Sequence, residues 1–350
     1  MSKFISSRFS RLTPYTPGEQ PVDKTYVKLN TNESPFPPSD KAVKAAAEEL
    51  EKLQLYPDPT CGNLRAALAQ RYGVTPDRVM VGNGSDEVLS FAFMAYGDKG
   101  VAFPDITYGF YRVFADLYGV DALEIPLCED FTIDVNAYKG LGRTIFIANP
   151  NAPTGIALTL SQIEEIVDAN PDSVVVVDEA YVDFGGESAV ALVEKYDNLL
   201  VTGTFSKSRS MAGARLGFGI ACPALIQDLE TLRYSTNPYN VNRVTLAAGL
   251  GQLADEKTTQ RNCRAIIENR EYTTRALEQM GFSVIPSCAN FVFATCPKIG
   301  GKDLYLRLKD AGILVRHFDT PRLKDYNRIT IGSREQMDAL LGAVKTILEE

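Results

Sequence analysis

Short apolar segments alternate with amphipathic segments from residue 78 to about residue 221, and this pattern constrains the fold more than any other feature of the chain. Strands that alternate with helices form mostly parallel sheets whose two faces are covered by helices. The fold class is therefore expected to be α/β. The predicted strands are Arg78–Val81, Gly100–Phe103, Thr144–Ala148, Ser173–Val177, Leu199–Thr202 and Leu216–Ala221, and the predicted helices between them are Asp86–Tyr96 and Leu160–Asn170.

The flanking segments predict two further parts of the chain. Residues 1–40 are irregular and rich in proline, which is typical of an extended arm that packs on other parts of the protein. Residues 41–255 are expected to form a large domain around the parallel sheet. Residues 256–350 begin with a long polar helix, about Thr258 to Met280, and continue with short strands and helices, which predicts a smaller α+β domain.

Composition excludes several classes of function. The chain has 350 residues and a formal net charge of -8, with scattered basic residues, which argues against a nucleic-acid partner. The longest apolar runs are too short to cross a bilayer, so no membrane segment is expected. The first residues lack the apolar core of a secretory signal, which predicts a cytoplasmic protein.

Cysteine and histidine usage argues against a metal centre. The six cysteines include no Cys-x-x-Cys pair, and His317 is the single histidine. We therefore expect neither a zinc site nor a disulfide framework. A catalytic triad is also disfavoured, because His317 would have to serve as its base.

Lys207 is the first candidate for covalent chemistry. It follows a predicted strand and lies in the run Thr204-Phe205-Ser206-Lys207, with Arg215 downstream. A lysine amine attacks an aldehyde when it is deprotonated, and burial beside a cation such as Arg215 lowers the pKa of a lysine. Taken alone, this segment is more typical of a solvated loop.

Other predicted strands also end in polar residues. The turn that contains Gly84, Ser85 and Asp86 predicts either a phosphate-binding loop or a plain helix cap. Asp178 ends another strand, where a buried carboxylate needs a cation or a strong donor, and Tyr181 follows three residues later. A Walker-B aspartate is the competing interpretation of Asp178, but the sequence contains no Gly-x-x-x-x-Gly-Lys-Ser/Thr loop.

Two further features lie at the same predicted edge of the sheet, since ligands of open α/β sheets bind at the carboxyl ends of the strands. The run Asn149-Pro150-Asn151-Ala152-Pro153-Thr154-Gly155 is typical of a rigid turn. Tyr108 follows the strand Gly100–Phe103 and offers a ring that could stack on a flat cofactor. A tyrosine in the core or on the surface is an equally good interpretation of this residue alone.

In chain order, these motifs resemble those of the fold-type I pyridoxal-phosphate aminotransferases. The flanking segments narrow the resemblance to the histidinol-phosphate aminotransferase group and extend it over nearly the whole chain. These segments are Lys28-Leu29-Asn30-Thr31-Asn32-Glu33-Ser34-Pro35, Tyr56-Pro57-Asp58-Pro59, Gly312-Ile313-Leu314-Val315-Arg316 and Arg328-Ile329-Thr330-Ile331-Gly332-Ser333-Arg334.

The resemblance implies pyridoxal 5'-phosphate as cofactor and assigns roles around it. Lys207 would form the Schiff base and move the proton, Asp178 would keep the ring nitrogen protonated, and Tyr181 would bind the phenolic oxygen. The resemblance also implies a homodimer in which Tyr56 reaches the cofactor phosphate of the neighbouring subunit. The other implied cofactor ligands are Gly84, Ser85, Asp86, Tyr108, Asn151, Thr204, Ser206 and Arg215.

One residue departs from the family pattern. The family usually carries asparagine immediately before Pro-Thr-Gly, where its amide binds the phenolic oxygen, but this chain has Ala152 there. Either Asn151, one position earlier, takes this role, or Tyr181 holds the oxygen alone.

The resemblance also implies the substrates. Arg316 and Arg328 would bind the phosphate of L-histidinol phosphate and the carboxylate of glutamate or 2-oxoglutarate, while Tyr15 and Asn30 of the arm would close over the substrate. An aromatic amino acid aminotransferase and a threonine-phosphate decarboxylase stay open as alternatives. A pyridoxal-phosphate-sensing regulator would need an additional DNA-binding module, for which the arm is too short and too rich in proline.

Overall fold

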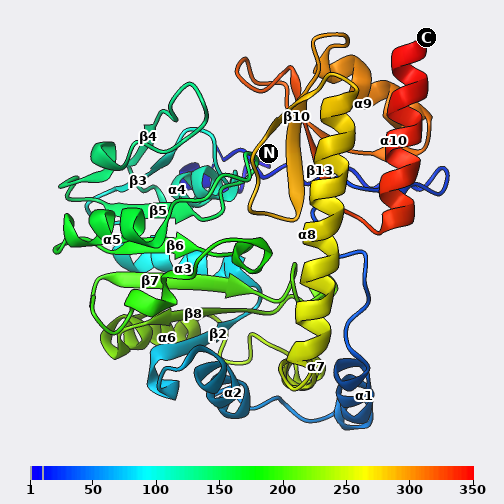
Figure 1. Ribbon diagram of the computed structural model, residues 1–350. Helices are drawn as coiled ribbons and strands as arrows, with labels where there is room; N and C mark the ends of the chain where they lie inside the picture. Colours follow the sequence, from blue (N-terminus) through cyan, green and yellow to red (C-terminus); the bar gives the residue numbers. More distant parts are fainter. Residues whose placement is uncertain (1, 10–11) are drawn as a thin grey trace.

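The computed structural model describes residues 2–9 and 12–350, and its centre is a seven-stranded sheet (Figure 1). In space the strands follow the order β2-β8-β7-β6-β5-β3-β4. Only β8 among them runs antiparallel to its neighbours, so the sheet is mostly parallel. The strands are β2 (Val79–Gly82), β3 (Val101–Pro104), β4 (Ala122–Ile125), β5 (Thr144–Ala148), β6 (Val175–Asp178), β7 (Leu199–Thr204) and β8 (Gly217–Ala221).

Helices cover both faces of this sheet. Side chains alternate along each strand, so Val175 and Val177 of β6 pack in one buried cluster while Val176 packs in another. The first cluster is completed by α2 (Gly62–Tyr72) and α5 (Leu160–Asp168). The second is completed by α3 (Ser85–Tyr96), α4 (Phe110–Tyr118) and α6 (Pro223–Thr236). The expectation of an α/β fold is confirmed.

A second, antiparallel sheet follows the long helix α8 (Glu256–Gln279), which extends from α7 (Arg243–Leu253) to this sheet (Figure 1). Its order is β12-β13-β10-β9, and it shares a separate buried cluster with α8, α9 and α10. The elements are β9 (Ser283–Ile285), β10 (Phe291–Thr295), β12 (Arg316–His317), β13 (Tyr326–Thr330), α9 (Gly301–Asp310) and α10 (Arg334–Glu349). The domain boundaries at residues 40 and 255 stay a prediction.

The N-terminal segment joins the two parts. Its strand β1 (Val27–Lys28) pairs in parallel with β11 (Ile313–Leu314). Helix α1 (Asp40–Glu49) then packs against α7, where a Cβ at Gly251 would lie 2.4 Å from the carbonyl oxygen of Lys41. Between β1 and α1, Thr31 and Glu33 lie near the C-terminal ends of the central strands. Among the described helices, none is long and apolar enough to cross a membrane.

Candidate active site

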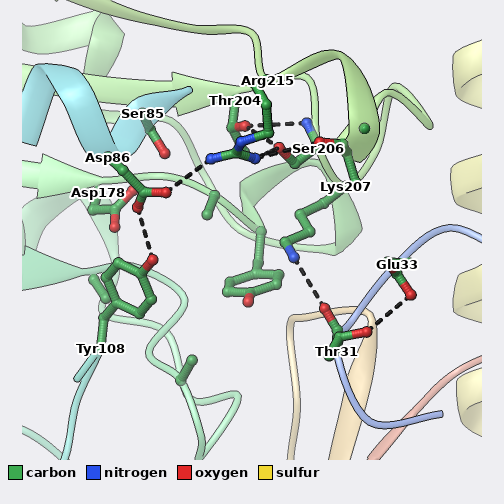
Figure 2. Close-up of a pocket in the computed structure, with 16 residues that line it drawn as sticks. Thr31, Glu33, Ser85, Asp86, Tyr108, Asp178, Thr204, Ser206, Lys207 and Arg215 are labelled. Atoms are coloured by element: carbon green, nitrogen blue, oxygen red, sulfur yellow. Dashed lines mark hydrogen bonds and ion pairs between the residues drawn. The ribbon is translucent and has the colours of Figure 1, made fainter. Parts of the chain in front are cut away.

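A cavity of about 320 Å³ lies at the C-terminal ends of β5, β6 and β7. Figure 2 shows Lys207 and Arg215 pointing into it from the loop after β7, with Asp86 and Tyr108 on the opposite wall. The lining residues are Thr31, Glu33, Ser85, Asp86, Tyr108, Ala148, Ala152, Asp178, Ala180, Tyr181, Thr204, Ser206, Lys207, Ala212, Gly213 and Arg215.

One end of the cavity is built from hydroxyls, a guanidinium and the first turn of α3. Arg215 Nη1 donates to Ser206 Oγ at 3.3 Å, and its Nη2 binds Asp86 at 2.9 Å (Figure 2). Thr204 Oγ1 donates to Ser206 Oγ at 2.9 Å. The α3 N-terminus directs its free N–H groups to the same place, so this end is suited to a phosphate group.

Close backbone approach shapes this end. A Cβ on Gly217 would lie 2.1 Å from the backbone nitrogen of Ser85, and a Cβ on Gly84 would lie 2.6 Å from Arg215 Nη2. Arg215 itself has a φ of 53°, an uncommon conformation for a residue other than glycine. Strained backbone conformations of this kind are concentrated at active sites and ligand-binding sites.

Asp178 lies at the floor of the cavity as the last residue of β6. It is 4% exposed and accepts hydrogen bonds from Thr202 Oγ1 at 3.1 Å and Tyr111 Oη at 3.2 Å. Burial raises the pKa of Asp178 to about 6, opposed by the Thr202 hydrogen bond, and the neighbouring Asp86 raises it further. A cationic group beside this carboxylate would therefore be strongly favoured.

Two aromatic side chains form walls on either side of the cavity. Tyr108 donates from its hydroxyl to Asp86 at 2.7 Å, and burial raises its pKa well above the ordinary value. Tyr181 lies across the cavity, with its ring centroid 5.9 Å from Lys207 Nζ. The Lys207 amine donates to the carbonyl oxygen of Thr31 at 3.2 Å, so it is held in the space between these walls and the arm (Figure 2).

A second cavity, of about 750 Å³, opens beside the first, and Lys207, Tyr108, Tyr181 and Ala152 line both. The arm and the antiparallel sheet form its far wall. The residues predicted to contact substrate, which are Tyr15, Asn30, Arg316 and Arg328, all line this cavity.

Arg328 is a partly buried cation, and no carboxylate among the described residues is paired with it. Its Nη2 donates to the carbonyl oxygen of Asn30 at 3.0 Å, its Nε atom is buried and has no hydrogen-bond partner among those residues, and burial lowers the pKa of its guanidinium. Arg316 is bonded only weakly, to the carbonyl oxygens of Thr16 and Pro17 at 3.3 and 3.4 Å. Two arginines held by carbonyl groups make this wall a binding surface for an anion with several oxygens.

Comparison with known proteins agrees with this geometry. Residues 24–344 match the model of the family described as aminotransferase class I and II. The chain belongs to this family.

Individual relatives align with this aminotransferase over nearly its whole length. It is 52% identical to a histidinol-phosphate aminotransferase of a Marinomonas species, over 99% of this chain and 100% of that one. It is 48% identical to the histidinol-phosphate aminotransferase of Brachyspira hyodysenteriae, over 100% of both chains. The crystal structure of the Sinorhizobium meliloti histidinol-phosphate aminotransferase in complex with pyridoxal-5'-phosphate has the same fold, with a TM-score of 0.89 at 24% identity over 99% of each chain.

The residues of this aminotransferase fit pyridoxal phosphate. The end that carries Arg215 and the α3 N-terminus suits its phosphate, and the buried carboxylate of Asp178 suits its protonated ring nitrogen. The Lys207 amine, which reaches into the space between them, suits its aldehyde.

Three of the predicted cofactor ligands do not line either cavity of this chain: Asn151, Gly84, which lies behind Arg215, and Tyr56, which is expected to act in the neighbouring subunit. The Asn151 amide donates to the carbonyl oxygen of Ile106 at 3.0 Å and to Thr154 Oγ1 at 3.2 Å, and its oxygen accepts from Thr107 Oγ1 at 2.8 Å. Asn151 thus stabilises the turn from beneath, and the methyl group of Ala152 lines the cavity instead. Tyr56 is 78% exposed and stacks on Tyr239.

Several residues of the site were not predicted. Thr202 binds Asp178 because the two are paired in the β6–β7 register, a signal that a strand alignment could have supplied. Tyr111 binds the same carboxylate from α4, where a tyrosine looks like ordinary core. Thr31 and Glu33 come from the arm, which has no periodic pattern to indicate which side chains face inward.

Proposed function

We propose that this aminotransferase moves an amino group between L-histidinol phosphate and 2-oxoglutarate, as a step of histidine biosynthesis. The observation that carries the proposal is the continuity of two cavities through Lys207: one end suits the phosphate of the cofactor, and the far wall carries Arg316 and Arg328. Relatives about half identical to this chain over its full length bear the corresponding name.

Pyridoxal phosphate, when bound, supplies an aldehyde and a ring that accepts electrons from the substrate's reacting carbon. The Lys207 amine would bind the aldehyde and would hold the proton that is exchanged with the substrate's reacting carbon. Asp178 would keep a proton on the ring nitrogen through its charge, and Tyr181 would donate a hydrogen bond to the phenolic oxygen. Tyr108 would pack on the ring, and the phosphate would be held by Gly84, Ser85, Asp86, Thr204, Ser206 and Arg215.

The second cavity would bind each substrate by its anionic end. The Arg328 and Arg316 guanidinium groups offer paired N–H donors to a phosphate in one half-reaction and to a carboxylate in the other. The buried Oδ1 of Asn30 has no hydrogen-bond partner in the described part of the chain, so it could accept a hydrogen bond from a substrate. Tyr15 of the arm lines this cavity, and its ring stacks on that of Phe110 with 4.4 Å between the centroids.

The protein is proposed to act as a homodimer in the cytoplasm. An exposed aromatic pair, Tyr56 and Tyr239, supports this proposal, because large exposed aromatic side chains are typical of contact surfaces. In such a dimer, Tyr56 would reach the cofactor phosphate of the other subunit.

A second candidate substrate is an aromatic amino acid. Tyr15, Tyr108, Ile106 and Phe318 give the substrate cavity a broad apolar wall, which could admit a phenyl ring as well as an imidazole. The arginine wall favours the phosphorylated substrate, because it offers two guanidinium groups to one anion.

A half-reaction experiment separates these substrates. The cofactor-loaded protein is mixed separately with histidinol phosphate, phenylalanine and threonine phosphate, and loss of the absorbance of the lysine-bound cofactor is followed. We expect histidinol phosphate to react fastest. A large advantage for phenylalanine would show that the substrate assignment is wrong, and release of carbon dioxide from threonine phosphate would identify a decarboxylase.

A further inference from the structure

The Tyr181 hydroxyl has a hydrogen-bond partner in the arm. Asn32 Nδ2 donates to the Tyr181 oxygen at 3.0 Å. Asn32 is 1% exposed and lies immediately beside Thr31, whose carbonyl oxygen holds the Lys207 amine. The arm therefore contacts both the nucleophile and the tyrosine on the opposite wall of the cavity.

Neighbouring strands fix the position of Asn32. Its backbone N–H donates to Thr330 Oγ1 at 3.0 Å, and its backbone carbonyl accepts from Asn290 Nδ2 at 3.0 Å. Its φ of 57° is a left-handed conformation that asparagine and glycine adopt more readily than other residues. The side chain is thus held rigidly by groups that belong to β13 and the segment before β10.

The hydrogen bonds of Thr330 agree with the orientation in which the Asn32 amide presents its NH2 group to Tyr181. Thr330 Oγ1 already accepts from the Asn32 N–H, so its own proton is available to the side-chain oxygen, Oδ1, at 3.0 Å. The amide NH2 group is left to face Tyr181. Because the tyrosine oxygen accepts this bond, its proton stays free to be donated elsewhere.

The side chains of Asn151 and Ala152, before Pro153, supply no competing donor. Every polar atom of the Asn151 amide is engaged beneath the turn, and Ala152 presents a methyl group to the cavity. We propose that Asn32 is a positioning residue that keeps the Tyr181 proton directed into the cavity, toward the phenolic oxygen of pyridoxal phosphate. This inference rests on the proposed function, because it assumes that the cofactor binds between Tyr181 and Lys207.

The glycine variant Asn32→Gly tests the inference, since it removes the side chain and still suits the left-handed backbone. The Tyr181 proton and the proton on the lysine-bound nitrogen compete for the same cofactor oxygen. Loss of the first should raise the pKa of the second, read from the absorbance of the cofactor-loaded protein against pH. We expect Asn32→Gly and Tyr181→Phe each to raise this pKa, the latter by about one unit or more. Asn32→Gly should also weaken pyridoxal phosphate binding several-fold.

The double variant separates an effect through Tyr181 from a general one. In the Tyr181→Phe background, Asn32→Gly should shift the pKa no further, because there is no phenol proton left to direct. Equal shifts in both backgrounds, or no shift in either, would overturn the inference. Arg328 also lies close to Tyr181, and its charge is the same in every variant.

Asn269→Ala is the matched control, since Asn269 is a buried asparagine of α8 that binds the carbonyl oxygen of Gly332 and does not line either cavity. It should leave the absorbance pKa unchanged, and a shift as large as that of Asn32→Gly would overturn the inference. No substrate enters this titration. Failure of histidinol phosphate to react would therefore refute the proposed function and leave the result for Asn32 as measured.

Discussion

Arg316 and Arg328 lie directly opposite each other on the antiparallel strands β12 and β13, and both line the substrate cavity. Two like charges on facing positions repel each other, so this pairing is costly unless an anion binds between them. The phosphate or carboxylate of a substrate would neutralise this repulsion.

Replacement of Arg328 by glutamine should weaken the binding of the substrate's anionic group. A charge-assisted hydrogen bond is worth about 1.5–3 kcal/mol, so kcat/KM for histidinol phosphate should fall by about 10- to 100-fold. Arg112→Gln is the control, because Arg112 is an exposed arginine paired with Asp116 and Glu124 on the surface. Steady-state kinetics measure both variants, and an unchanged kcat/KM in Arg328→Gln would exclude Arg328 from substrate binding.

The buried charge of Asp178 should lower the stability of the folded protein when the cofactor is removed. Its folded pKa of about 6 lies above the ordinary aspartate value of 3.8, so the folded state binds the proton more tightly than the unfolded state. The cofactor-free protein should therefore gain stability as the pH falls from about 6 toward 3.8, by roughly 3 kcal/mol in all and by about half of that at pH 5. Asp178→Asn should lack this component of the pH dependence.

Thermal unfolding of the cofactor-free forms between pH 8 and pH 5 measures the difference. At pH 8, Asp178→Asn should be the more stable protein, and the gap should narrow as the wild type takes up its proton. If the stabilities of the wild type and of Asp178→Asn changed in parallel with pH, Asp178 would not titrate in this range. With cofactor present, the same variant should lose nearly all transaminase activity, because a neutral amide cannot stabilise a protonated ring nitrogen.

The phosphate end should be sensitive to a single methyl group. Gly217→Ala would place a Cβ 2.1 Å from the Ser85 nitrogen and push β8 away from the start of α3. We expect pyridoxal phosphate affinity to fall by at least about 10-fold, since one or more backbone contacts to the phosphate would be lost. Gly342→Ala, in α10 with open space around it, should leave the affinity unchanged. Fluorescence titration of the cofactor-free proteins compares the two.

The sequence was informative wherever a side chain follows a buried strand. Asp178 and Lys207 could be placed together because the carboxyl ends of parallel strands meet at one edge of a sheet. The antiparallel direction of β8 was not predicted, because strand polarity is set by the path of the connections and leaves no trace in an apolar run.

The sequence did not indicate which side chains of the arm face the cavities. Asn30 and Asn32 are neighbours in a polar, irregular segment, yet one lines the substrate cavity and the other binds Tyr181. No helical or strand period marks such residues, and their positions depend on pairing with β11 and β13, more than 280 residues away. Asn151 is the opposite case. It lies next to the position where the family carries its asparagine, but its amide binds Ile106, Thr107 and Thr154 and does not face the cavity.

The role of Lys207 has direct consequences for activity. Lys207→Ala should abolish transamination, because the side chain is required both to bind the aldehyde and to move the proton. Lys195→Ala, which removes an exposed lysine paired with Glu164, should retain activity. Residual turnover in Lys207→Ala comparable with that of Lys195→Ala would contradict the assigned role.

Borohydride trapping tests the account most directly. The cofactor-loaded protein is reduced, digested and mapped by mass spectrometry to find the lysine that carries the pyridoxyl group. We predict that the group is attached to Lys207 and that Lys207→Ala yields no labelled peptide. A pyridoxyl group on any other lysine of the wild-type protein would contradict the account.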